Sequence, residues 1–332
     1  MTVSSQITFV CCVESGWLEA QTLRMIESLR RWGGQFADAP IFAVTPRFGP
    51  PLAPKTLQAF VKFRVKYLRF DPKDQYSWFP FLNKPYSLLA AAEHATTEAI
   101  CWLDSDILFV DEPNLLFLKE GEDFLGCASD KETGTSGPED PWDLSWKENC
   151  KTLGIDIEAL PWITTEQEKK RIRLYWNGGI FVYRRSTDYA KHYLQSCIQL
   201  LKACQFFKLP GFAFGCNEQR SVALTMVKMG LSWRALPFSH DYIMNNLTHE
   251  EWYNEEQLRE AKVVHYHGSM GPDFWHEFIK CLRATHPTVA DWLAPMGPLK
   301  NEAPFYCRSM AKILKYYRSK QQESYKELCT LI

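Results

Sequence analysis

Two aspartates separated by a single residue are the side chains of this chain best suited to chemistry. Asp104 and Asp106 lie within the apolar run of residues 100–110. Because both faces of that run are apolar, it predicts a buried strand of a parallel sheet, with the charged groups where the strand ends. Paired carboxylates at the carboxyl end of such a strand offer hard oxygen ligands to Mg²⁺ or Mn²⁺. The alternative is that Asp104 caps a turn and Asp106 forms a surface ion pair.

A histidine pair near the end of a second predicted strand could complete such a site. His265 and His267 fall in the strand-like run of residues 261–268, and alternation along a strand points them to the same side. A neutral imidazole can add a third ligand to two carboxylates. The alternative is a hydrogen-bonded histidine of the core or the surface.

Two further patterns favour a ligand site. Asn177, Gly178 and Gly179 precede an apolar run, and two glycines allow a ligand to approach the backbone closely, although an ordinary turn has the same composition. Glu218 and Gln219 begin a predicted helix, where they could face the edge of the sheet or serve only as a favourable helix start.

The elements that must position these residues alternate between strand and helix. This order predicts an α/β fold with a doubly wound, mostly parallel sheet flanked by helices. The expected strands cover residues 7–13, 40–45, 65–70, 100–110, 174–183 and 261–268, and the expected helices cover 18–32, 83–94, 186–203, 216–229 and 304–332.

Composition excludes several classes of protein. The chain has 332 residues, 46% of them hydrophobic and 23% charged, which is enough for a sizeable core. A net charge of −1 gives no general basis for binding nucleic acid. Among its 12 Trp, those at 142, 146, 162 and 176 are expected to line a carbohydrate acceptor cleft.

The cysteines and the amino terminus indicate a cellular compartment. The 11 Cys include no Cys-x-x-Cys pair and read as buried thiols of a reducing environment. The first residues resemble no signal peptide, and no run reaches the length of a membrane span. We therefore expect a cytoplasmic protein, soluble or peripherally bound to a membrane.

Taken in this order, the four patterns resemble those of GT-A-fold nucleotide-sugar glycosyltransferases. The similarity is greatest to the retaining group that includes glycogenin and the bacterial lipopolysaccharide galactosyltransferases, and it covers residues 7–270. It implies that Asp104 and Asp106 hold Mn²⁺ (or Mg²⁺) on the diphosphate of the donor. The third ligand it implies is His265, with His267 as the alternative, because both stand in the matching string.

The resemblance also implies residues that bind and activate the donor. Glu218 and Gln219 match the family's acidic residue and Gln beside the donor sugar, although the family more often has Asp in place of Glu218. No Lys-Pro-Trp follows Gly268, where the family usually has it. The implied contacts to the sugar nucleotide are Val13, Lys84, Ser105, Asn177, Gly178, Gly179 and Gly268.

The implied activity is metal-dependent transfer of a sugar, with retention, from a nucleotide-diphosphate donor, most often a UDP-sugar, to a carbohydrate or glycosylated acceptor. Inversion would instead need a base, for which the chain offers Asp130, Glu139, Asp140 and Asp143. Two other classes stay open. A sugar-phosphate nucleotidyltransferase would carry a Gly-rich basic loop after the first strand, which this chain lacks. A non-catalytic carbohydrate-binding protein would need neither the carboxylate pair nor the histidines.

The expected organisation is one catalytic domain over residues 1–300, with 129–170 as an insertion or mobile loop region because it is polar and rich in Gly and Pro. Residues 301–332 form a basic helical tail. Its charges suit either a solvated face of a packed helix or contact with a membrane surface.

Overall fold

A seven-stranded sheet forms the centre of the computed structural model, which describes residues 6–205, 214–244 and 253–330. The strand order is β10-β6-β9-β4-β1-β2-β3. One half is parallel and is formed by β1 (Ile7–Cys12), β2 (Ile41–Thr45), β3 (Val65–Arg69) and β4 (Ala99–Leu103). In the other half, β9 (Ile180–Arg184) runs antiparallel between β4 and β6 (Phe124–Gly126), and β10 (Trp233–Ala235) lies beside β6.

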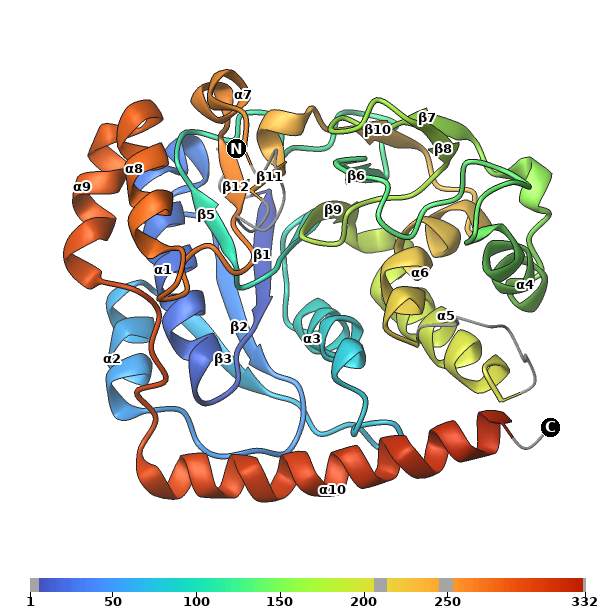
Figure 1. Cartoon of the computed structure of the whole chain (residues 1–332), viewed down its shortest axis with the longest axis horizontal. Helices are drawn as coiled ribbons and strands as arrows, with labels where there is room; N and C mark the ends of the chain where they lie inside the picture. Colours follow the sequence, from blue (N-terminus) through green and yellow to red (C-terminus); the bar gives the residue numbers. More distant parts are fainter. Residues whose placement is uncertain (1–5, 206–213, 245–252, 331–332) are drawn as a thin grey trace.

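Helices cover both faces of this sheet, as predicted for a doubly wound fold (Figure 1). On one face, Phe9 and Cys11 of β1 pack with Met25 of α1 (Trp17–Trp32). On the other, Val10 packs in a cluster that includes Leu88 of α3. The helices of this second face are α3 (Asn83–Ala92), α5 (Tyr189–Ala203) and α6 (Phe214–Lys228). A strand buried on both faces needs no polar alternation, which explains the apolar runs in the sequence.

The predicted strand over residues 100–110 is wrong in extent, because the chain turns sharply at the aspartates. Strand β4 ends at Leu103, and the Ile107 amide donates to the Asp104 carbonyl at 3.3 Å. Residues 107–109 then form β5 (Ile107–Phe109) in a second sheet of order β11-β12-β5, with β11 (Tyr242–Ile243) and β12 (Val263–His265). The run predicted over 174–183 likewise becomes a strand only at Ile180. Asp104 and Asp106 thus lie in the connection between two sheets.

Several helices and strands were not predicted from the sequence. The polar region 129–170 contains α4, whose Trp146, Cys150 and Leu153 are buried at helical spacing, as well as half of a small hairpin. The division into a domain and an insertion stays a prediction. The elements not predicted include α2 (Pro54–Lys62), α4 (Asp143–Leu153), β7 (Trp162–Thr164), β8 (Arg171–Arg173), α7 (Glu255–Glu260), α8 (Trp275–Thr285) and α9 (Pro287–Leu293).

The predicted helical tail is present as α10 (Phe305–Thr330), a long helix along one side of the molecule that ends near α5 (Figure 1). The predictions for the first five residues and the last two lie outside the described residues. Within the described ranges, no helix is both long and apolar enough to span a bilayer.

The ten cysteines whose side chains the structure describes are free thiols, nine of them buried and Cys329 partly exposed. This agrees with their prediction as buried thiols.

Candidate active site

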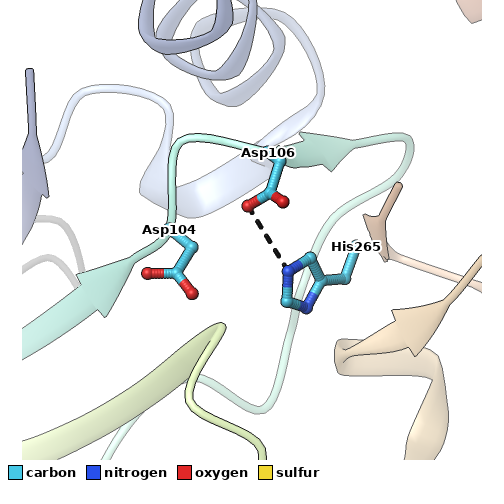
Figure 2. A group of neighbouring side chains, drawn as sticks. All are labelled: Asp104, Asp106 and His265. Carbon is cyan, nitrogen blue, oxygen red and sulfur yellow. Dashed lines mark ion pairs between the residues drawn. The ribbon is translucent and has the colours of Figure 1, made fainter. Parts of the chain in front are cut away.

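Three strand ends bring the predicted metal ligands together (Figure 2). Asp104 follows β4, Asp106 precedes β5, and His265 is the last residue of β12. One ligand atom from each of the three lies within 4.8 Å of the others, and the Asp106 Oδ1 to His265 Nε2 distance is 3.4 Å. The pairing of β12 with β5, which sets His265 opposite Ile107, fixes this approach.

Of the two histidines, His265 faces the carboxylates. The strand ends at His265, and the backbone of His267 takes a left-handed conformation with φ of 45°. The His267 ring therefore stacks on the ring of His265, with centroids 4.1 Å apart, and lies outside the group of ligand atoms. The alternation expected of a regular strand does not extend past His265.

A buried carboxylate that sequence reasoning missed supports the His265 ring. Asp241 has no exposed surface, and its Oδ1 lies 3.5 Å from His265 Nδ1, while Ser129 donates to its Oδ2 at 2.7 Å. Burial acts to lower the pKa of His265, but Asp106 and Asp241 raise it well above its usual range. If a metal ion displaces the proton on Nε2, the proton that stays on Nδ1 beside Asp241 leaves the Nε2 lone pair free to bind that ion. Asp241 follows a short helical turn with no motif around it, so no sequence signal could have found it.

Lys84 balances the carboxylates on the other side of the site. Its Nζ lies 3.5 Å from Asp104 Oδ1 and 3.3 Å from Glu218 Oε1, and it donates to the Gly178 carbonyl at 2.8 Å. Burial raises the pKa of Asp104 to about 6, and Lys84 opposes that rise. The Tyr193 hydroxyl donates to Glu218. Lys84 thus joins α3, β4 and α6 at one point.

The predicted catalytic pair lines a cavity next to these groups. Gln219 donates from Nε2 to Glu132 Oε2 at 3.0 Å and to the Tyr175 hydroxyl, which holds its amide in a fixed orientation. The cavity has a volume of about 310 Å³. Its lining includes Cys12, Lys84, Asp104, Ser105, Asp106, Glu218 and Gln219. We call it the donor cavity.

The segment of Asn177, Gly178 and Gly179 lies against the metal-ligand group. Asn177 Oδ1 accepts from the Gly179 amide at 2.9 Å, and the Gly179 carbonyl accepts from the Asp104 amide at 2.8 Å. A Cβ on Gly179 would lie 2.5 Å from His265 Nδ1. The glycine is therefore needed because the imidazole occupies the space of a side chain.

The other predicted donor contacts are Val13, Ser105 and Gly268, of which Ser105 is part of the cavity lining. The Val13 side chain is fully buried in the core beside α1. Ser105 lines the donor cavity but donates its hydroxyl to the Cys12 carbonyl at 2.9 Å. Gly268 forms a turn, in which its carbonyl accepts from the Gly271 amide at 2.8 Å.

Comparison with known proteins identifies the family. Residues 9–213 match the model of the Rhodobacterales glycosyltransferase domain. The chain belongs to this glycosyltransferase family. No curated protein matches its sequence.

Solved structures agree on the fold. The bifunctional glycosyltransferase WbbM superposes with a TM-score of 0.50 at 13% identity over 86% of this chain and 51% of that one, so this chain spans about half of its length. The galactosyltransferase LgtC, in complex with donor and acceptor sugar analogues, gives 0.50 at 12% identity over 91% and 99%. The predicted GT-A fold is confirmed, and of the classes left open the chain is a glycosyltransferase.

Several residues proposed for the acceptor side have structural roles instead. Trp146 and Trp176 have no exposed surface and therefore cannot stack on a sugar. Asp140 pairs with Lys131 and Asp143 with Lys147. Asp130 contacts the segment of Asn177, Gly178 and Gly179, because its Oδ1 accepts from Asn177 Nδ2 at 3.4 Å. Burial and the nearby Glu132 raise the pKa of Asp130 to about 7.

Proposed function

We propose that this glycosyltransferase transfers a sugar, with retention, from a UDP-sugar to a carbohydrate or glycosylated acceptor, and that the transfer depends on Mn²⁺ or Mg²⁺. The observation that carries the proposal is the convergence of Asp104, Asp106 and His265 beside the donor cavity. Two carboxylates and one imidazole form a set of ligands that suits Mn²⁺ and, less well, Mg²⁺.

The surroundings of these residues fit a divalent ion. Asp104 and Asp106 both line the donor cavity, and Lys84 Nζ lies 3.5 Å from Asp104 Oδ1. The Asp241 carboxylate, whose Oδ1 lies 3.5 Å from His265 Nδ1, would orient the imidazole, as is common for histidines that bind metals. When bound, the ion would supply positive charge to the donor diphosphate as it leaves.

The chain's own groups would act together on the donor. Lys84 would add a point charge to the same phosphate oxygens, and this interaction strengthens as charge develops. The Gln219 amide, held by Glu132 and Tyr175, would lie near the anomeric carbon. Glu218 is bound by Lys84 and Tyr193, so we assign it to positioning Lys84 and to the sugar hydroxyls.

Replacing Asp241 by Asn should weaken metal binding without removing a metal ligand. The amide would present either an NH₂ or a neutral oxygen to His265 Nδ1, which removes the charge that orients the ring. We expect Mn²⁺ affinity to fall by about 10- to 100-fold. Titration calorimetry with Mn²⁺ measures this, and an unchanged affinity would remove Asp241 from the site. Asp123→Asn, at a partly exposed ion pair with Arg184, is the matched control.

The donor and the metal dependence can be tested in one assay. We expect the purified protein to release UDP from a UDP-sugar in the presence of Mn²⁺ and not in the presence of EDTA. A panel of sugar nucleotides identifies the sugar and the base, and the anomer of the first product distinguishes retention from inversion. Turnover that is equal in Mn²⁺ and in EDTA would contradict the proposal.

The cellular setting stays a prediction. The free buried thiols support a reducing, cytoplasmic location. The exposed side of α10 carries aromatic and basic residues, which supports contact with an anionic membrane surface. Sedimentation with anionic and neutral vesicles tests this contact. The residues concerned include Phe305, Tyr306, Arg308, Lys312, Tyr316 and Tyr317.

A further inference from the structure

A second cavity lies between α10 and the carboxyl ends of β1 and β2. Its volume is about 340 Å³. Residues 14–15 line it after β1, Thr45 and Arg47 line it at the end of β2, and Arg318 and Gln322 line it from α10. We call it the α10 cavity.

The polarity of the side of α10 that faces the protein changes over this cavity. Near one end of the helix Cys307 is buried against the Pro51 carbonyl, and near the other Tyr325 packs on Tyr76 and Trp78. Between them, the residues of α10 that line the cavity are mixed, with apolar Ala311 and Leu314 followed by the polar or charged Lys315, Arg318, Ser319 and Gln322. A helix that only covers a sheet presents an apolar stripe along its whole length, so the polar and charged residues that α10 places over this cavity are not required for packing.

Arg47, which lines this cavity, has one guanidinium nitrogen without a hydrogen-bond partner among the described residues. Its side chain is only 9% exposed. Its Nε and Nη2 donate to the two Glu14 oxygens at 2.6 and 2.9 Å, whereas its Nη1 has no hydrogen-bond partner among the described residues. The buried Ser15 hydroxyl is also without one in that part of the chain. Unsatisfied buried donors are costly, so a ligand that brought acceptor oxygens to this arginine would be stabilised by it.

The charges around the α10 cavity also favour a ligand that carries hydrogen-bond acceptors. Its lining contains three cations, Arg47, Lys315 and Arg318, and one carboxylate, Glu14. Arg318 donates from Nη2 to the Phe48 carbonyl at 2.5 Å, which fixes its guanidinium beside the cavity.

The α10 cavity and the donor cavity lie along the same edge of the sheet. Pro80 lines both. In the sheet, β4 lies next to β1 and β1 next to β2, so the order along the carboxyl edge is Asp104, then Cys12 and Glu14, then Arg47. The α10 cavity therefore lies where the nucleoside of a nucleotide would reach it if its diphosphate were held at the metal ligands and it extended along this edge.

We infer that α10 completes a nucleoside pocket, in which Arg47 Nη1 and Arg318 donate to the carbonyl oxygens of a uracil base. The inference rests on the proposed function, and it assigns donor recognition to a helix outside the matched residues 9–213. Uracil offers two carbonyl acceptors, whereas cytosine replaces one of them with an amino group that would face two guanidinium groups. The pocket thus selects UDP over CDP.

Calorimetry with two probes tests this. UDP with Mn²⁺ occupies both cavities, whereas inorganic pyrophosphate with Mn²⁺ occupies only the metal side. We expect Arg318→Met to weaken UDP binding by about tenfold or more, as for loss of a charged hydrogen bond, and to change pyrophosphate binding by no more than about twofold. Arg308→Met removes the same charge from an exposed position of α10 and should leave both affinities unchanged.

A second variant fills the cavity without removing a charge. Ser319 is an exposed residue at the cavity rim, and Ser319→Tyr should weaken UDP binding but not pyrophosphate binding. Equal losses for the two probes, unchanged UDP affinity in both variants, or equal affinity of the wild type for UDP and CDP would each overturn the inference while leaving the proposed function intact. A wild-type protein that binds neither probe with Mn²⁺ would overturn both.

Discussion

Replacing Asp106 by Asn should lower the rate of sugar transfer by about 1,000-fold or more, the loss expected when the main electrostatic group of an active site is removed. The amide keeps the size of the carboxylate but removes a charged ligand, and Asp106 faces His265 at 3.4 Å. The fold should survive, because the backbone carbonyl of Asp106 still accepts from the Tyr266 amide at 3.0 Å. Initial rates at saturating Mn²⁺ and the melting temperature measure the two effects.

Asp111→Asn is the matched control for this variant. Asp111 lies just past β5 and forms an exposed ion pair with Lys262, so its loss should leave the rate near that of the wild type. Near-normal turnover of Asp106→Asn would show that Asp106 binds no essential metal. A large loss in Asp111→Asn would mean that any change of charge near β5 disturbs the enzyme.

Replacing Lys84 by Met should lower both activity and stability. The Lys84 side chain is 11% exposed and lies between Asp104 and Glu218, so its removal leaves two carboxylates without their shared cation. We expect kcat/KM to fall by about 100-fold and the free energy of unfolding by about 3 kcal/mol. Mn²⁺ should recover part of the stability, because a bound ion would replace one positive charge beside Asp104.

Chemical denaturation with and without Mn²⁺ measures the stability difference, and steady-state kinetics measures the activity. Lys73→Met is the control, because Lys73 forms an exposed ion pair with Asp71 and should change neither quantity. A Lys84→Met protein that keeps full activity would exclude Lys84 from contact with the donor. A loss of stability that Mn²⁺ does not reduce would contradict the placement of the metal beside Asp104.

Much of the site could be predicted because its residues lie in short motifs at strand and helix ends. Asp104, Asn177 and Gln219 are each identified by their immediate neighbours, and the parallel half of the sheet follows from apolar runs that alternate with helices. The long strand predicted through Asp106 failed because an apolar run is the same whether one strand continues or two meet at a turn. Only the pairing of β5 with β12 distinguishes the two cases.

Other features depend on contacts that no local pattern encodes. Asp241 reaches His265 through the arrangement of the second sheet, and its sequence neighbourhood resembles any loop. The burial of Trp146 and Trp176 is decided by the packing of α4 and by strands distant in sequence, so aromatic content alone suggested a sugar-binding role that these side chains cannot have. The α10 cavity joins residues that are far apart in the sequence, such as Arg47 and Arg318.

The central claim is that Asp104, Asp106 and His265 together bind one divalent ion that contacts the donor diphosphate. Electron paramagnetic resonance tests it directly, because free Mn²⁺ gives a signal that disappears on binding. We predict one Mn²⁺ site in the wild type, tighter binding when UDP is present, and an affinity reduced by about tenfold or more in Asp106→Asn. Equal Mn²⁺ affinity in the wild type and Asp106→Asn, with no effect of UDP on either, would contradict the claim.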